Sequence, residues 1–278
     1  MSRFPQRRTV PLLWSLSPIL LAFLVCLSFS LPAQASEFSV PILLYHRFAP
    51  TSTNPYTVTL QEFEAQLSYL KEKGYQVIPL KSLVDSYLGK GSPLPPRAVV
   101  ITIDDGHASV YTHAWPLLRR FGYPATLFLY PCCIERAGYA LTWDQIRKMA
   151  DQGLDIGSHT HFHPNFKIER RRLAPQAYEE LVVKELTSSK KILEERLGRP
   201  IYYLSYPFGY HDEVLEKRGF EAGYLAMFTI ARQPCGPSSN RGALGRYIID
   251  PQITLHTFSS ILSPGDNNKN HLPSARMR

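Results

Sequence analysis

The stretch that decides the fold is AVVITIDDG, residues 98–106. It opens with a run of apolar and β-branched residues, and Asp104 and Asp105 follow that run directly. A continuous run of this kind is typical of a strand buried on both faces of a parallel sheet. Two carboxylates at the end of a buried strand are costly to desolvate without a cation. The stretch therefore predicts a central parallel strand with charged chemistry at its carboxyl end.

Short apolar runs alternate with helical patterns along the rest of the chain. Repeated alternation predicts an α/β fold with a parallel sheet, either wound open or closed as a barrel, in a single domain without internal repeats. Two capping boxes mark helix starts at Thr59 and Thr142. The expected strands are 40–45, 75–78, 98–103, 125–130, 154–157, 201–206 and 224–230. The expected helices run from Thr59 to Gly74, through Leu83 and Leu88, over 109–121, from Thr142 to Gly153, and over 176–197, 212–218 and 254–262.

A second motif, HTHFHP at residues 159–164, places His159 and His163 four residues apart behind another apolar run. One carboxylate with two imidazoles suits a divalent metal that keeps open coordination positions. A spare carboxylate beside a metal-bound water is the arrangement of a hydrolase. Two plainer interpretations are that the aspartates cap the next helix and that the histidines are ordinary surface residues. The residues that carry chemistry follow strand ends, where α/β barrels place their active sites: His46, Asp104, Asp105, His159, Pro207 and Phe208.

Three motifs, in this order, resemble those of the polysaccharide deacetylases, carbohydrate esterase family four. They are IDDG at 103–106, HTxxHP at 159–164 and YPFG at 206–209. The opening VPILLYH at 40–46 is similar to an exported bacterial subgroup that includes poly-N-acetylglucosamine deacetylases. The resemblance extends from about residue 40 to residue 262.

The resemblance implies a distorted (β/α) barrel and one divalent metal, usually zinc. It implies that Asp105, His159 and His163 are the metal ligands and that Asp104 is the general base. It also implies that the backbone N–H of Phe208 binds the oxyanion and that Trp143 lies near the sugar groove. His161 is not expected to be a ligand, and His107, which replaces an aromatic residue of the family, is expected to be a loop residue.

The resemblance offers two candidates for the general acid. The common family arrangement takes a histidine near the carboxyl terminus, for which His256 is the candidate, whereas the subgroup has this strand at the start and would use His46. We favour His46, because it ends a clear strand, whereas His256 lies in an expected helix. Many members also place an arginine against the base just before the YPFG motif, where this chain has Ser205, and Arg246 is the expected substitute.

These residues predict a metal-dependent hydrolase that removes acetyl groups from an N-acetylated or O-acetylated polysaccharide. Two alternatives stay open. One is a metal amidase that acts on a small non-sugar molecule, and the other is a glycan-binding domain of the same fold without catalysis.

The two ends of the chain are expected to lie outside the catalytic domain, residues 36–262. Residues 1–35 have the pattern of a signal peptide, with arginines before the apolar stretch Leu12–Leu31 and a small-x-small cleavage site at its end. An uncleaved membrane anchor is the alternative. Residues 263–278 are polar and are expected to be disordered. The sequence therefore predicts an exported protein in the periplasm, the medium or the cell envelope.

Charge and cysteine content bear on partners and redox state. The net charge of +8 is concentrated at the ends, since residues 1–35 contribute +3 and residues 263–278 contribute +2, which leaves +3 for the core. A core charge of this size does not indicate a nucleic-acid-binding protein. An oxidising compartment allows one disulfide, for which Cys235 with either Cys132 or Cys133 is the plausible pair, with one thiol left over.

Overall fold

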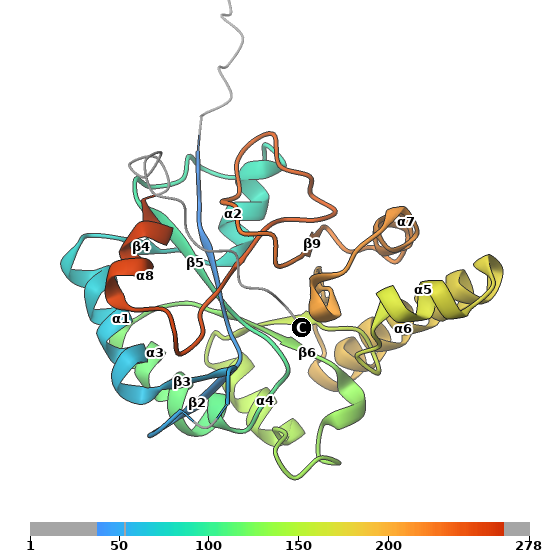
Figure 1. Cartoon of the computed structure of the whole chain (residues 1–278), viewed down its shortest axis with the longest axis horizontal. Coiled ribbons are helices and arrows are strands. Elements are labelled where there is room, and N and C mark those ends of the chain that lie inside the picture. Colours follow the sequence, from blue (N-terminus) through green and yellow to red (C-terminus); the bar gives the residue numbers. More distant parts are fainter. Residues whose placement is uncertain (1–37, 53, 264–278) are drawn as a thin grey trace, which may run out of the picture. The chain divides into compact units, whose positions relative to one another are not determined.

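Eight parallel strands form one curled sheet in a computed structural model that describes residues 38–52 and 54–263 (Figure 1). Along the sheet the strands follow the order β10-β1-β5-β6-β7-β8-β9, and β4 pairs with the first residues of β5. The strands are β1 Ile42–Tyr45, β4 Gln76–Val77, β5 Ala98–Ile103, β6 Thr126–Leu129, β7 Asp155–Ser158, β8 Tyr203–Ser205, β9 Ala226–Phe228 and β10 Tyr247–Ile248. A separate parallel pair is formed by β2 Arg47–Ala49 and β3 Thr57–Thr59.

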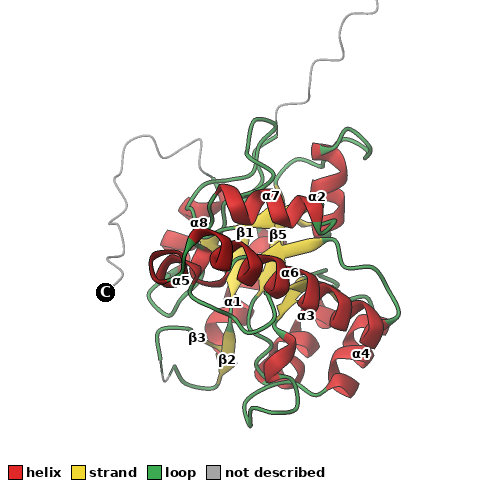
Figure 2. Cartoon of the chain, turned by 90° about the vertical axis from the view of Figure 1, so that its right-hand side faces the viewer, coloured by secondary structure: helices red, strands yellow, loops and turns green. Residues whose placement is uncertain are grey.

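Helices lie outside the strands (Figure 2). Parallel neighbours need crossover connections, and here most of these connections contain a helix. The α-helices are α1 Leu60–Glu72, α2 Leu80–Tyr87, α3 Trp115–Phe121, α4 Trp143–Asp151, α5 Phe166–Arg172, α6 Pro175–Leu197, α7 Glu213–Glu221 and α8 Leu255–Leu262. A π-helix, η2 Val110–Ala114, precedes α3, and short 3₁₀ turns, η3 Pro131–Cys133 and η4 Pro207–Gly209, follow β6 and β8.

One segment joins the two edges of the sheet. Leu244 forms a parallel bridge with Phe228 of β9, and three residues later Tyr247 pairs with Leu43 of β1. Hydrogen-bonded neighbours therefore continue from β1 through β9 and back to β1. This is the distorted (β/α) barrel that the motifs imply, and Arg246 lies between the two contacts with no exposed surface.

The carboxyl ends of the strands meet at one edge of the barrel. Tyr45 pairs with Ile103 across β1 and β5, and Leu129 pairs with Ser158 across β6 and β7. The residues that follow these strands are thereby brought to the same edge: His46, Asp104 and His159.

The helix predicted over 109–121 is present without a break, but its first turns form the π-helix η2, which continues into α3. Pro116 lies at the start of α3 and has no N–H to donate to the preceding turn, which favours a wider turn there. Both predicted capping boxes are present, at Thr59 and Thr142. The sequence patterns missed α5, β10 and the β2–β3 pair, which are short or strongly polar.

The disulfide that the sequence allows is absent from the described residues. Cys132, Cys133 and Cys235 are all free. Cys235 exchanges both backbone hydrogen bonds with Val40, just before β1 begins, whereas the other two cysteines follow the carboxyl end of β6. The pair would have to join opposite ends of the barrel.

The predicted signal peptide and nearly all of the predicted tail lie outside the described residues. Residues 38–52 and 54–263 belong to one compact unit, in agreement with a single domain. None of the helices in these ranges has the length and apolar character needed to span a bilayer.

Candidate active site

Asp104 and Asp105 follow β5 but have different environments. The N–H of Asp104 donates to the carbonyl of Tyr45 (2.9 Å), which extends the β1–β5 pairing by one residue, and its side chain is buried. Asp105 has a left-handed backbone (φ 79°), and so does Gly106 after it. A Cβ at Gly106 would lie 2.6 Å from the Leu129 side chain, so only glycine fits this turn. Both carboxylates come close to Nε2 of His159, Asp104 at 3.8 Å and Asp105 at 3.5 Å.

Asp104 forms a two-pronged ion pair with Arg246. The two guanidinium Nη atoms of Arg246 donate to Oδ1 (2.9 Å) and Oδ2 (2.7 Å) of Asp104, and Ser205 Oγ donates to Oδ2 (2.8 Å). Arg246 Nε donates to the carbonyl of Thr229 (3.1 Å). Burial opposes ionisation of Asp104, but the charges of Arg246 and His159 outweigh burial and hold its pKa below the ordinary value. Asp104 is therefore an ionised carboxylate whose orientation is fixed from behind.

Asp105, His159 and His163 bring three ligand atoms together. One carboxylate oxygen and one ring nitrogen from each histidine lie within 4.8 Å of one another. Oδ1 of Asp105 lies 3.5 Å from Nε2 of His159 and 3.6 Å from Nε2 of His163. Two imidazoles and one carboxylate form a donor set that suits a divalent cation and leaves positions for water and substrate.

The tautomer of His159 follows from its partner. Its Nδ1 lies 2.7 Å from the backbone carbonyl of Ser205, and because a carbonyl only accepts, Nδ1–H is the donor. Its other ring nitrogen, Nε2, faces Asp105. Burial opposes a charge on His159, but the charges of Asp104 and Asp105 outweigh burial and raise its pKa, so a bound cation would displace the proton on Nε2. The hydrogen bond from Nδ1 holds the ring in a ligating orientation, as is common for metal-binding histidines.

The loop after β7 is held so that His163 returns to His159. Thr160 and His163 both have left-handed backbones, and the N–H of His163 donates to Oγ1 of Thr160 (3.2 Å). The buried carboxylate of Glu185, from α6, accepts the N–H groups of His161 (2.9 Å) and Phe162 (2.8 Å). The ring of His161 packs on Phe162 and is not part of the three-ligand cluster.

The charges at the cluster favour cation binding. Burial lowers the pKa of His163 to about 4, with the nearby His159 acting in the same direction, so this ring is neutral at neutral pH. Burial opposes a charge on Asp105, but hydrogen bonding and charge from His159, His46 and His163 hold its pKa far below the ordinary value. A neutral imidazole and an ionised carboxylate are the forms in which these groups bind a metal.

His46 and His256 lie in different places. His46 follows β1 at the barrel edge, and its Nδ1 is buried without a hydrogen-bond partner among the described residues. Burial lowers the pKa of His46, while the charges of Asp105 and Asp104 act to raise it, so its ring lies within electrostatic range of both carboxylates. His256 is exposed in the first turn of α8, a helix that packs on α1 outside the sheet.

Phe208 and Trp143 differ in their exposure and in their closeness to the cluster. Phe208 is in η4 with a left-handed backbone (φ 57°), and its exposed ring lies 4.9 Å from that of His163. Trp143 starts α4, is only 6% exposed, and is covered by Arg196, 5.4 Å from the ring centre. Its surroundings are those of a packing residue, and its contact with sugar stays a prediction.

Two contacts at the site had little or no signal in the sequence. Ser205 was noted only as the residue that replaces an arginine, yet it binds both Asp104 and, through its carbonyl, His159. Glu185 lies in the middle of a long amphipathic helix, where a glutamate is ordinarily solvated. Its helical neighbours Val182, Leu186 and Ser189 are buried, and a glutamate on such a face is the one available clue.

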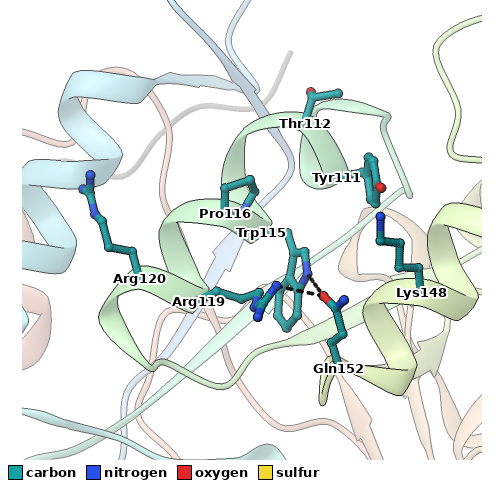
Figure 3. A pocket seen from close by; sticks show the side chains of 8 residues that line it. All are labelled: Tyr111, Thr112, Trp115, Pro116, Arg119, Arg120, Lys148 and Gln152. Carbon is teal, nitrogen blue, oxygen red and sulfur yellow. Dashed lines mark hydrogen bonds between the residues drawn. The ribbon is translucent and has the colours of Figure 1, made fainter.

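A separate hollow of about 740 Å³ lies between η2–α3 and α4 (Figure 3). Trp115 and Arg119 both donate to Oε1 of Gln152 across it (3.2 Å each), and Lys148 lies over the ring of Tyr111. None of the metal-site residues lines this hollow, so it is distinct from the cluster at the barrel edge.

Comparison with known proteins identifies the class. Residues 91–227 match the family model described as polysaccharide deacetylase. The chain is 31% identical over 223 residues to YxkH of Bacillus subtilis, whose name places it among the polysaccharide deacetylases; the match covers 75% of this chain and 76% of YxkH. This chain therefore belongs to the polysaccharide deacetylase family, carbohydrate esterase family four, a family of enzymes.

More specific relatives share the same domain. A poly-beta-1,6-N-acetyl-D-glucosamine N-deacetylase of Staphylococcus aureus is 25% identical over 72% of this chain and 70% of its own length. The structure of IcaB from Ammonifex degensii superposes with a TM-score of 0.69 at 28% identity and covers 81% of this chain and 97% of that one. The deacetylase PplD of Streptococcus pyogenes, at 21% identity, superposes with a TM-score of 0.73 over 82% and 99% of the two chains and shares the fold.

Proposed function

We propose that this chain is a metal-dependent deacetylase that removes acetyl groups from an acetylated polysaccharide, and that poly-N-acetylglucosamine is the first substrate to test. The observation that carries the proposal is the Asp105, His159 and His163 cluster beside an ionised Asp104 held by Arg246. Family membership and the similarity to a poly-N-acetylglucosamine deacetylase support the substrate class.

The donor set fits a divalent cation, and zinc is the ion we propose. His159 has its Nδ1–H occupied and its Nε2 directed at Asp105, so Nε2 is the nitrogen that would bind a metal in exchange for its proton. A bound cation would polarise the acetyl carbonyl and lower the pKa of a water molecule. Asp105, His159 and His163 would hold it.

Asp104 is assigned as the general base. Its Oδ2 lies 3.8 Å from Nε2 of His159, so the carboxylate borders the cluster without belonging to it. Arg246 and Ser205 hold both of its oxygens from the interior, which fixes the carboxylate for proton transfer from the attacking water. Arg246 is thus a positioning residue.

His46 is assigned as the acid that protonates the leaving amine. An amine departs poorly as an anion, so a proton donor is required near the acetyl group. His46 lies at the same barrel edge and within the influence of both carboxylates. The backbone N–H of Phe208 is assigned to the carbonyl oxygen by family resemblance, and the closeness of Phe208 to His163 agrees with this role.

The deciding experiment measures acetate released by the purified chain from a panel of acetylated glycans, both N-acetylated and O-acetylated, with and without a chelator. We expect release from at least one glycan, loss of release with the chelator, and recovery on addition of zinc. Release only from small non-sugar amides would identify an amidase instead. Glycan binding without any release of acetate would identify a non-catalytic domain.

Export is part of the proposal, because an extracellular polymer must be met outside the cell. It rests on the predicted signal peptide, residues 1–35. Sequencing of the amino terminus of the mature protein tests it: cleavage after Ala35 is the expected result, and an intact terminus would indicate an anchor.

A further inference from the structure

Two exposed tyrosines flank the candidate active site. Tyr56 is 52% exposed and its ring lies 5.5 Å from that of His46. Tyr139 is 43% exposed and its ring lies 5.9 Å from that of His107, with the two planes only 11° apart. His46 follows β1, and His107 comes two residues after Asp105. Both tyrosines therefore lie beside the strand ends that hold the site.

Tyr139 is fixed in one orientation. Its hydroxyl is hydrogen-bonded to that of Tyr130 (2.8 Å), and the Tyr130 ring lies 5.1 Å from the ring of His163. Its backbone carbonyl accepts the N–H of Ala108 (2.7 Å), and the adjoining Ala140 forms a bridge with His107. An exposed ring anchored at both ends presents a flat apolar surface that loses little freedom when something binds to it.

Arg47 lies between the two tyrosines. It starts β2 and pairs with Thr57, and its N–H donates to the carbonyl of Tyr56 (3.2 Å). Its guanidinium carbon lies 5.7 Å from the centre of the Tyr139 ring. Its Nε is buried and has no hydrogen-bond partner among the described residues. A buried donor of this kind is costly unless something accepts from it.

Hydrogen bonds through Ser109 also join the β2–β3 pair to the turn after Asp105. The N–H of Phe48 donates to Oγ of Ser109 (3.0 Å), and the same Oγ is hydrogen-bonded to Nδ1 of His107 (2.8 Å). The β2–β3 pair and the turn after Asp105 are therefore one connected surface rather than two independent loops.

We propose that Tyr56, Tyr139 and Arg47 form a sugar-binding subsite that holds the unit of the polysaccharide next to the one being deacetylated. A sugar ring has an apolar face of C–H groups that packs on aromatic rings, and oxygens that accept from a guanidinium. The surface offers both kinds of contact beside the site. The inference rests on the proposed function and adds which side of the site the chain occupies.

The charge of Arg47 has a further consequence. Arginine keeps its charge at all relevant pH values. A sugar unit that has already lost its acetyl group carries an ammonium, and like charges repel. The subsite therefore prefers an acetylated neighbour, so that the enzyme acts less well beside a unit that it has already processed.

The test compares Tyr139→Ala with the wild-type chain on an N-acetylated glucosamine oligosaccharide and on a small chromogenic acetate ester. We expect kcat/KM on the oligosaccharide to fall about three- to tenfold, mainly through KM, because a contact present in both ground and transition states is lost. The ester, which is too small to reach the subsite, should be hydrolysed at the wild-type rate.

Two controls separate the roles. Tyr139→Phe keeps the ring but loses its hydrogen bond to Tyr130, so its loss on the oligosaccharide should be smaller than that of Tyr139→Ala. Tyr202→Ala removes a similarly exposed tyrosine (42%) just before β8, at the opposite end of that strand from the site, and should have no effect on either substrate. If Tyr139→Ala loses activity equally on oligosaccharide and ester, or loses none on either, the subsite is wrong but the proposed deacetylase function still stands. A wild-type chain that releases no acetate from any glycan would overturn the proposed function and the subsite with it.

Arg47→Gln tests the charge. The wild-type chain should prefer an oligosaccharide with an acetylated neighbour over one with a free amine there by up to about fivefold, and the variant should lose this preference. An unchanged preference would show that Arg47 does not face the neighbouring unit.

Discussion

The inner and outer halves of the candidate active site contain adjacent carboxylates with opposite partners. Asp104, in the inner half, faces Arg246 and Ser205 and has its charge balanced inside the protein. Asp105, in the outer half, faces two histidines, of which His163 is neutral at neutral pH. The charge of the inner carboxylate is balanced by Arg246, whereas in the outer half a bound cation would replace the proton of His159 as the partner of Asp105.

This difference shows how one strand end can supply two functions. A carboxylate that is already paired keeps its position whether or not a metal is bound. A carboxylate whose partners are histidines can exchange their protons for a metal ion. Consecutive side chains of an extended chain already point to opposite faces. The left-handed turn at Asp105 adds to this by bringing its carboxylate to the histidine loop.

Replacing each of the two carboxylates in turn by an amide should give the clearest difference between the two halves. We expect Asp105→Asn to lose bound metal and all metal-dependent activity, because one of three ligands is removed. We expect Asp104→Asn to keep its metal and lose activity by about a hundredfold or more, the range for removal of a general base. Elemental analysis and acetate release measure the two quantities.

His161→Ala is the matched control for this experiment, because it alters the same loop outside the ligand cluster and should keep its metal. A metal-free Asp104→Asn protein, or a metal-loaded Asp105→Asn protein with normal activity, would mean that the two halves have been assigned the wrong way round.

His46 belongs to neither half, because its proposed role is to protonate the leaving amine. His46→Ala should reduce the rate by about a hundredfold or more with metal content unchanged. An acid must be protonated to act, so activity falls as the pH rises through the pKa of that acid, and the variant should lack this alkaline limb. His256→Ala should be nearly silent in a pH–rate profile, and the reverse ranking would return the role to the carboxyl-terminal histidine.

Stability should respond to the inner half. Arg246→Met leaves the buried carboxylate of Asp104 without its cation, which should lower the free energy of unfolding by about 3–5 kcal/mol. Arg120→Met, which breaks the exposed pair with Glu64, should change it by less than about 1 kcal/mol. Urea unfolding of the two variants measures the difference, and equal stabilities would show that Arg246 does not balance the charge of Asp104.

Asp155 offers a smaller contrast with Asp104. It starts β7, and burial raises its pKa, with Thr126, the backbone of Ile156 and Arg199 only partly opposing this. The folded protein therefore disfavours the ionised form, so the contribution of Asp155 to stability is present below the pKa of the unfolded chain and lost as the pH rises through the raised value. Asp155→Asn should be more stable than wild type at pH 7, by less than about 1 kcal/mol, with the gain fading toward pH 4. Thermal unfolding across this range checks it, and a gain that grows on acidification would contradict the sign.

The residues of the candidate active site were more predictable from sequence than the residues that hold them in position. Asp104, Asp105, His159 and His163 follow apolar runs, and parallel strands bring their carboxyl ends to one edge, so their meeting could be inferred from pattern alone. Ser205 and Glu185 could not be found in this way, because their importance depends on which groups lie opposite them in space.

The same limit accounts for the incorrect expectation about cysteines and for the π-helical first turns of the helix predicted over 109–121. Cysteine content and compartment indicate whether a disulfide is allowed, but not the distance between thiols at opposite ends of a barrel. The apolar period of residues 109–121 predicts a helix, but its π-turn before Pro116 depends on local hydrogen bonding rather than on periodicity.

The sequence by itself determined the alternation of strands and helices, the strand ends that carry charge, and the ligand types at the spacing that a metal site needs. These depend on local periodicity and on residue chemistry, which are properties of the chain alone. The resemblance offered Arg246 as the expected partner of the base, but only the tertiary structure decided that it binds both carboxylate oxygens of Asp104, from a segment 142 residues away that joins both edges of the sheet. Closure of the barrel depends on pairing between distant strands, and no local pattern encodes which buried charges then face each other.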